Sequence, residues 1–249
     1  MLSEAPGTVA VPMSEVGRFA AFTVALAGTI QPPGCHLSVM ASASVTENLN
    51  SSIRTMPEDS EWLWILGDDH IWAHNCLMHM LSVLDDNPDI DILVPLVVKR
   101  NPPFHLVVFH QDDSLVEPRV QEKMSTFRPY EWAEVPDTGV FEIDAAGSAG
   151  MLIRRHVLDA MSEPWFRSTG GVILNEDVTF CLDARDRGFR LFATADIVMG
   201  HLGIFNVRPC RHEGRWGAKV EFTTPDERYR EVFMPDIEEK HALAVNGHA

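Results

Sequence analysis

The stretch Trp62–His70, which reads WLWILGDDH, decides the fold class of this chain. Its first five residues are apolar on both faces of an extended chain, which is typical of a strand buried on both sides in a parallel sheet that helices cover. The run stops at Asp68, Asp69 and His70, and ligands of such sheets bind beyond the carboxyl ends of the strands. Two carboxylates and an imidazole at that edge can hold a divalent cation, and the cation can hold a diphosphate. The alternative interpretation is a turn in which an aspartate caps a helix.

Strands and helices are expected to alternate along the rest of the chain. The apolar run Phe19–Ala27 predicts a first strand, and the turn that closes it, which contains Thr29, is expected to face a ligand. Apolar residues at helical spacing, together with stop signals such as Asn87–Pro88, predict the other elements. The expected helices cover residues 45–56, 71–86, 154–161 and 175–187, and the expected strands cover 62–66, 90–98, 151–153, 189–193 and 197–199. This alternation predicts the α/β class, with a mostly parallel sheet flanked by helices.

Composition limits the class of protein. The chain has 249 residues with 45% apolar content, which is enough for one large α/β domain, and we expect residues 1–17 and 235–249 to be loosely ordered. A net charge of −16 disfavours a broad electrostatic grip on nucleic acid. Four scattered cysteines without a CxxC pair suggest neither a zinc knuckle nor a disulfide framework. The apolar stretch Phe19–Ile30 is too short for a membrane span and lacks a basic flank, so we expect a cytoplasmic protein without membrane contact.

Three further segments are candidates for binding or chemistry. Glu176 and Asp177 open an expected helix, where acids favour the helix dipole whatever else they do. Gly147–Gly150 consists of small residues, which either permit close approach of a ligand or form a tight connection between strands. The basic cluster that begins at Arg208 is expected in a loop, which is either a solvated surface loop or a mobile loop that closes over an anion.

Taken in order, three of these elements resemble the GT-A glycosyltransferases, the nucleotide-sugar-dependent transferases built on a Rossmann-like sheet. Leu66–His70 resembles the DXD motif of that family, and Asn175–Val178 followed by Arg185–Phe189 resembles its acidic helix. The distal His201, after a strand, completes the pattern. The resemblance implies a single GT-A domain over residues 18–234, with a nucleotide-binding half up to residue 100 and an acceptor and metal half from residue 101.

The third position of the motif is His70 rather than an aspartate, which is similar to the polypeptide N-acetylgalactosaminyltransferases. In those enzymes the aspartate, the nearby histidine and a distal histidine bind manganese, so the resemblance implies Asp68, His70 and His201 as ligands. Nitrogen ligands favour Mn²⁺ over Mg²⁺, and the cation would act as a Lewis acid on the leaving diphosphate. Asp69 is open to three interpretations: a contact to the ribose or sugar, a replacement metal ligand, or a cap of a helix from Ile71.

The resemblance also implies roles for the remaining candidates. In inverting members an acid of this motif is the general base, which matches Asp177 best, with Glu176 beside it. In retaining members the same region contacts the sugar, and the stereochemical outcome stays open. Gly147, Ser148 and Gly150 would line the donor sugar. Arg208 would close over the diphosphate and exclude water.

The prediction is therefore a metal-dependent transferase that moves a sugar from a nucleoside diphosphate sugar to an acceptor hydroxyl. UDP is the expected nucleotide because it is the commonest donor of the family. The acceptor is a carbohydrate, a small metabolite, a protein side chain or a hydroxylated nucleic-acid base. One alternative is a catalytically inactive module that binds a nucleotide sugar or a metal. Another is a non-haem iron oxygenase, whose facial triad also contains two histidines and a carboxylate, although its histidine usually precedes the acid on an all-β fold.

Overall fold

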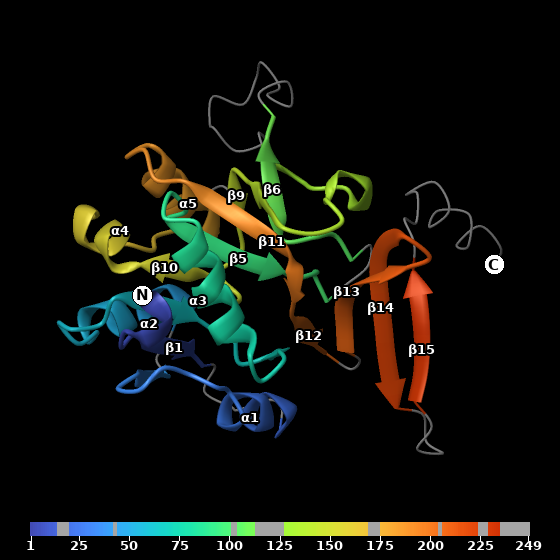
Figure 1. Cartoon of the computed structure of the whole chain (residues 1–249), viewed down its shortest axis with the longest axis horizontal. Coiled ribbons are helices and arrows are strands. Elements are labelled where there is room, and N and C mark those ends of the chain that lie inside the picture. The colour runs from blue at the N-terminus through green and yellow to red at the C-terminus, as the bar shows by residue number, and fades with distance from the viewer. Residues whose placement is uncertain are drawn as a thin grey trace.

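A computed structural model describes residues 1–13, 20–41, 44–100, 104–112, 127–168, 175–203, 206–223 and 229–234 (Figure 1). Its helices are α1 (Ala20–Ala27), α2 (Val45–Arg54), α3 (Cys76–Asp86), α4 (Arg155–Ala160) and α5 (Glu176–Arg185), with short 3-10 turns η1 (Leu2–Glu4) and η3 (Trp132–Glu134). The strands of the central sheet are, in spatial order, β2 (His36–Met40), β1 (Thr8–Pro12), β3 (Trp62–Ile65), β10 (Leu152–Arg154), β5 (Ile92–Leu96), β11 (Leu191–Val198) and β8 (Val140–Glu142).

The central sheet is mostly parallel. Strands β1, β2 and β3 pair in parallel, as do β5 and β11. Strand β10 lies antiparallel between β3 and β5, and β8 is antiparallel to β11. Five strands therefore point the same way, and their carboxyl ends meet at one edge. The predicted fold class, α/β with a mostly parallel sheet flanked by helices, is confirmed.

Two hydrophobic cores lie on the two faces of this sheet. Along β3 the side chains of Trp62 and Trp64 enter one core, together with residues of α1 and α3. Those of Leu63 and Ile65 enter the other core, which α2, α4 and α5 cover. All four residues are at most 1% exposed. The prediction that this apolar run is a strand buried on both sides is confirmed, and it sits near the middle of three layers (Figure 1).

The predicted first strand is wrong. Within Phe19–Ala27 the described residues form the helix α1, because an eight-residue run that contains four alanines favours a helix, and short apolar runs do not reveal their period. The first strand is instead β1, in the segment that we expected to be loosely ordered. All five residues of β1 are buried between β2 and β3. Residues 8–12 are therefore part of the central sheet rather than loosely ordered.

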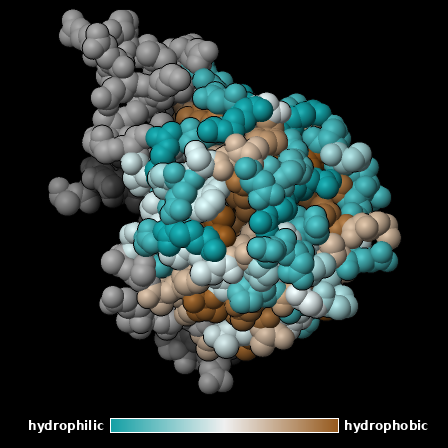
Figure 2. All heavy atoms as spheres, turned by 90° about the vertical axis from the view of Figure 1, so that its left-hand side faces the viewer, coloured by the Kyte–Doolittle hydropathy of each residue, from teal (hydrophilic) through white to brown (hydrophobic). Residues whose placement is uncertain are grey.

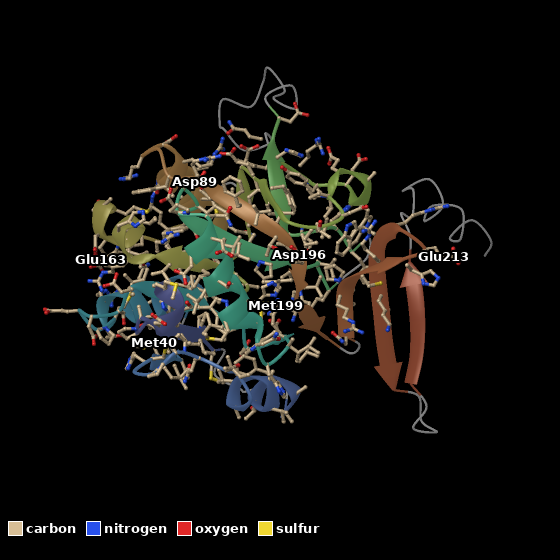
Figure 3. All side chains as sticks on the ribbon, in the orientation of Figure 1. Met40, Asp89, Glu163, Asp196, Met199 and Glu213 are labelled. Carbon is tan, nitrogen blue, oxygen red and sulfur yellow. The ribbon has the colours of Figure 1, made fainter. Side chains whose placement is uncertain are left out.

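Two smaller sheets accompany the central one. The strands β4 (His70–Ile71), β12 (Gly200–Leu202), β13 (Asn206–His212), β14 (Arg215–Thr223) and β15 (Tyr229–Met234) form one sheet, and β6 (Val108–Gln111), β7 (Phe127–Pro129) and β9 (Ala145–Ala146) form the other. A helix from Ile71 is thus wrong, since α3 begins at Cys76. The expected basic loop is the antiparallel hairpin β13–β14, whose turn contains Glu213 (Figure 3).

The surface is mixed in character. Figure 2 shows hydrophilic residues over much of one face, with brown hydrophobic patches in its lower half. The exposed large hydrophobic residues include Val24 of α1 and Leu37 and Val39 of the edge strand β2. No helix among the described residues is long and apolar enough to cross a membrane. The expectation for residues 235–249 lies outside the described residues.

Two glycines with positive φ provide a matched test of the packing that fixes the 147–150 loop. At Gly150, with φ +77°, an added Cβ would lie 2.5 Å from Met199 Sδ and 2.5 Å from Pro95 Cγ (Met199 is labelled in Figure 3). At Gly188, with φ +89°, an added Cβ meets nothing within 4 Å. We expect Gly188→Ala to cost about 1 kcal/mol from backbone strain alone, and Gly150→Ala to cost about 3 kcal/mol because overlap adds to the strain. Chemical denaturation of the two variants measures this difference, and equal costs would contradict it.

Candidate active site

A cleft of about 350 Å³ opens at the carboxyl edge of the parallel strands. Pro12 ends β1, Ile65 ends β3 and Val97 follows β5, and all three line the cleft. The remaining lining residues are Val45, Gly67, Asp68, Asp69, His70, Arg100, Val107, Gly147, Ser148, Ala149, Asp177 and His201. The predicted location of the site, beyond the ends of the strands, agrees with the position of this cleft.

Asp69, His70 and His201 form the cluster that could hold a metal ion. One ligand atom from each lies within 4.8 Å of the others. The backbone positions them, because His70 on β4 is the antiparallel cross-strand partner of His201 on β12, and the two rings stack with centroids 4.2 Å apart. Asp69 Oδ1 lies 2.9 Å from His70 Nδ1, and Asp69 Oδ2 lies 3.3 Å from His201 Nε2. Gly67 permits this fold-back, since a Cβ there would lie 2.6 Å from His70 Nδ1.

The hydrogen bonds of His201 leave its Nε2 as the nitrogen that can bind a cation. Nδ1 lies 2.9 Å from the Val98 carbonyl oxygen, which can only accept, so Nδ1 carries a proton. Nε2 then faces the Asp69 carboxylate either as a lone pair or with a second proton. A metal-binding histidine usually donates the N–H of its other ring nitrogen to a backbone carbonyl or a carboxylate, as His201 Nδ1 does to Val98. A cation at Nε2 would take the place of the second proton.

His70 fits the same purpose. Its side chain is only 6% exposed, and its Nε2 is buried without a hydrogen-bond partner among the described residues. Its Nδ1 is close to Asp69 but lacks hydrogen-bond geometry. Burial lowers the pKa of His70 more than the neighbouring carboxylate raises it, so the ring stays neutral. A neutral, buried imidazole with one unpartnered nitrogen is costly in an apolar setting and suited to coordination.

The Asp69 carboxylate carries the negative charge of the cluster and lies between the two histidines. Burial alone would raise the pKa of its carboxyl, but His201 and His70, which lie at its two oxygens, hold the pKa well below its usual range. Arg100, which follows β5, donates from Nη1 to Asp69 Oδ2 at 2.7 Å. In the sequence Arg100 stands just after an expected strand, where it could face a ligand or lie in a surface turn, and nothing singles it out.

Asp177 is the second acid in the cleft. It lies in the first turn of α5, and its Oδ1 is buried without a hydrogen-bond partner among the described residues. Burial, and then the charge of Glu176, raise the pKa of Asp177 to about 6, although hydrogen bonds from Ser148 lower it. A carboxyl group with a pKa near neutrality that faces a cleft is suited to proton transfer.

Of the other predicted site residues, Asp68 lies in the cleft, whereas Thr29 and Gly150 do not line it. Asp68 is buried and lines the cleft, but it is outside the Asp69 cluster. Thr29 does not line the cleft: its Oγ1 donates to the Ala25 carbonyl and accepts from Trp72 Nε1, which secures the end of α1. Gly150 also lies away from the lining and serves the packing described above.

Glu176 and Arg208 are the last two predicted site residues, and neither lines the cleft. Glu176 acts on the cleft through its charge on Asp177 and is not part of the lining. Arg208 follows Val207 on β13, and Val207 is the cross-strand partner of His201. Since neighbouring residues of a strand point to opposite faces, Arg208 lies on the other face of the sheet from His201. Its contact to a diphosphate stays a prediction.

Comparison with known proteins gives structural neighbours only. The chain is similar to the crystal structure of A197 from STIV, at 12% identity over 93% of this chain and 95% of that chain, with a TM-score of 0.52. It is also similar to GalNAc-T7, solved with UDP, GalNAc and Mn²⁺, at 14% identity over 72% of this chain and 33% of that chain, with a TM-score of 0.45. The chain thus spans about a third of the length of GalNAc-T7. No protein-family model and no curated protein matches the sequence. At these identities the likeness to A197 concerns the fold alone, and the weaker likeness to GalNAc-T7 carries no argument.

The buried carboxyl of Asp177 makes stability depend on pH in a defined direction. A pKa raised to about 6 from an ordinary 3.8 gives a contribution to stability that is complete below pH 3.8 and is lost as the pH rises through 6. We expect metal-free Asp177→Asn to be more stable than the wild type by about 1–3 kcal/mol at pH 7.5 and equally stable near pH 4. Denaturation at both pH values in a chelator measures this. Asp186→Asn, an exposed aspartate at the end of the same helix, is the control and should show no such pH dependence.

Proposed function

We propose that this chain is a metal-dependent glycosyltransferase of the GT-A type, which moves a sugar from a nucleoside diphosphate sugar to an acceptor hydroxyl. The observation that carries the proposal is the convergence of His70 on β4, His201 on β12 and Asp69, which directly precedes β4, in a cleft that Asp177 also lines. The ordered motifs of the sequence supply the reaction class. The proposed donor is a UDP-sugar, since UDP is the commonest donor of the family that the motifs resemble.

The residues present fit a transition metal. Two imidazoles, one with a buried unpartnered nitrogen, and a carboxylate held in its ionised form are a donor set for Mn²⁺ rather than for Mg²⁺ or Ca²⁺. His70, His201 and Asp69 would hold the ion, which makes Asp69 the replacement metal ligand of the three interpretations. Asp68, the ligand that the resemblance implies, lines the same cleft. A bound ion would supply Lewis-acid stabilisation of the charge on the leaving diphosphate.

Asp177 is the proposed general base in an inverting reaction. With a pKa of about 6, a large part of the carboxyl is ionised at neutral pH, so it accepts a proton from an acceptor hydroxyl. Ser148 hydrogen-bonds to Asp177 and orients it, and Glu176 raises its basicity through charge. In a retaining reaction Asp177 would contact the sugar instead.

The small residues of the 147–149 loop would allow the sugar to approach the cleft wall closely. A Cβ at Gly147 would lie 2.7 Å from Val107 Cγ1 and 3.7 Å from Asp177 Oδ2, so this glycine keeps open the space beside the acid. The proposed acceptors are soluble hydroxyl compounds in the cytoplasm. The net charge of −16 weighs against a nucleic-acid acceptor.

Nucleotide binding tests the donor site. We expect calorimetric titration to show that one of UDP, GDP or their sugars binds only with Mn²⁺, and that His201→Ala weakens this binding at least about 10–100-fold because a ligand is lost. His156→Ala is the matched control, since His156 lies outside the cleft in an ion pair with Asp91. If no nucleotide binds to the metal-loaded protein, the glycosyltransferase function is excluded. A non-haem iron oxygenase is then the better-supported function.

Transfer or slow donor hydrolysis tests the chemistry. We expect Asp177→Asn to lower kcat by about 10²–10⁴-fold while nucleotide affinity is kept, since the variant lacks only the proton acceptor. The wild-type rate should rise with pH through about 6. Rates of both proteins with a panel of hydroxyl acceptors measure this. Binding without turnover in the wild type would instead identify an inactive binding module, and a loss below about 10-fold would remove Asp177 as the base.

A further inference from the structure

We propose that Arg100 is a displaceable counter-ion, which occupies the metal-binding carboxylate until a diphosphate draws it away. The inference rests on the proposed function and concerns how the same site is regulated. Its basis is one contact: Arg100 Nη1 lies 2.7 Å from Asp69 Oδ2, the oxygen that also faces His201 Nε2. A cation bound between Asp69 and His201 would therefore stand beside the guanidinium.

Two positive groups compete for one carboxylate oxygen. Asp69 carries a single negative charge, and Arg100 already neutralises it in an ion pair that the cleft partly shields from water. A divalent cation that arrives while Arg100 stays would face like-charge repulsion at short range, where screening by salt is weak. Metal binding and the Arg100–Asp69 pair therefore oppose each other.

Arg100 is the partner that can leave. The side chain of Asp69 is 15% exposed and that of His201 is 17% exposed, whereas that of Arg100 is 38% exposed. The two histidines are fixed by the pairing of β4 with β12 and by their stacked rings. Arg100 stands just after β5 and lines the cleft, and its long side chain has several rotatable bonds through which the guanidinium can leave Asp69.

A diphosphate supplies the alternative partner. A guanidinium presents five N–H donors in a planar fork that matches two phosphate oxygens, and charge-assisted bonds of this kind are among the strongest. When the diphosphate binds, Arg100 gains these contacts and Asp69 is released to the metal. Metal and diphosphate thus assist each other through Arg100, and this coupling is reciprocal by linkage. The metal alone should bind weakly, which would keep the site empty until a donor is present.

Titration of Mn²⁺ alone separates this role from ordinary phosphate binding. A residue that only contacts phosphate would not affect the metal in the absence of nucleotide. We expect Arg100→Ala to bind Mn²⁺ alone about 10-fold more tightly than the wild type. Lys99→Ala is the matched control, because it removes the neighbouring exposed positive charge and should leave Mn²⁺ affinity unchanged. Denaturation curves establish that both variants are folded.

Titration of UDP, with GDP in parallel, tests whether Arg100 moves from Asp69 to the diphosphate. In the wild type, UDP should tighten Mn²⁺ binding both through its own contact to the metal and through the release of Asp69, and in Arg100→Ala this enhancement should be about 10-fold smaller. Arg100→Lys keeps the charge but lacks the fork, so it should bind Mn²⁺ alone as weakly as the wild type and recover only part of the enhancement.

The outcomes distinguish this inference from the function on which it rests. If the wild type binds Mn²⁺ and UDP but Arg100→Ala binds Mn²⁺ alone equally or more weakly, Arg100 is not a counter-ion and the transferase proposal stands. If folded wild type and variants bind neither Mn²⁺ nor any nucleotide, both proposals fail. A third outcome also overturns the proposal: Arg100→Ala binds Mn²⁺ more tightly, but UDP increases its Mn²⁺ affinity as much as in the wild type. Arg100 would then repel the metal without forming a new contact to the diphosphate.

Discussion

The pairing of the short strand β4 with β12 is the constraint on which the cleft depends. It sets His70 opposite His201, stacks their rings, and places both beside Asp69, although His201 lies far along the chain from the other two. A second contact strengthens the link, since the Leu202 amide donates to the Asp69 carbonyl at 2.6 Å. Backbone hydrogen bonds, rather than side-chain contacts alone, therefore hold the ligand atoms within reach of one another. Small residues make this possible: a Cβ at Gly200 would lie 2.8 Å from Ile71 Cγ1 of the opposing strand.

Polar groups in this cleft are arranged at a cost to the folded state. His70 Nε2 and Asp177 Oδ1 are buried without partners among the described residues, and groups of this kind usually persist only where a ligand or a reaction needs them. The surrounding structure supports them with two apolar cores on the two faces of the sheet, which fix the ends of β1, β3 and β5. The sheet thus presents buried polar atoms without partners at its edge, where loops of small residues leave room for a ligand.

Much of this could be predicted from the sequence, and the failures have physical causes. The run from Trp62 to His70 predicted a two-sided strand that ends at a polar edge, because its apolar residues have no exposed face. Helical spacing and stop signals also predicted α2, α4 and α5 to within a few residues, and α3 except for its start. The run before Ala27 is too short and too uniform to show a period, so its apolar residues predict a strand where the chain forms α1. The resemblance implied Asp68 as the ligand and left Asp69 open, because sequence alone does not tell which of two adjacent aspartates faces the histidines; the backbone brings Asp69 to them. Arg100 carries no local signal, because its partner is distant in sequence.

The place of β10 in the sheet has a consequence for how the chain is made. Strands β3 and β5 are parallel, yet neither pairs with the other, because β10 lies between them and arrives much later in the sequence. A ribosome adds about 5–20 residues per second, so during synthesis both strands wait for several seconds with unpaired edges before the segment around Ile153 emerges. Exposed strand edges are prone to wrong pairing with other chains. A fragment that ends before β10 would keep both edges unpaired, so we expect it to aggregate rather than to form a smaller stable domain.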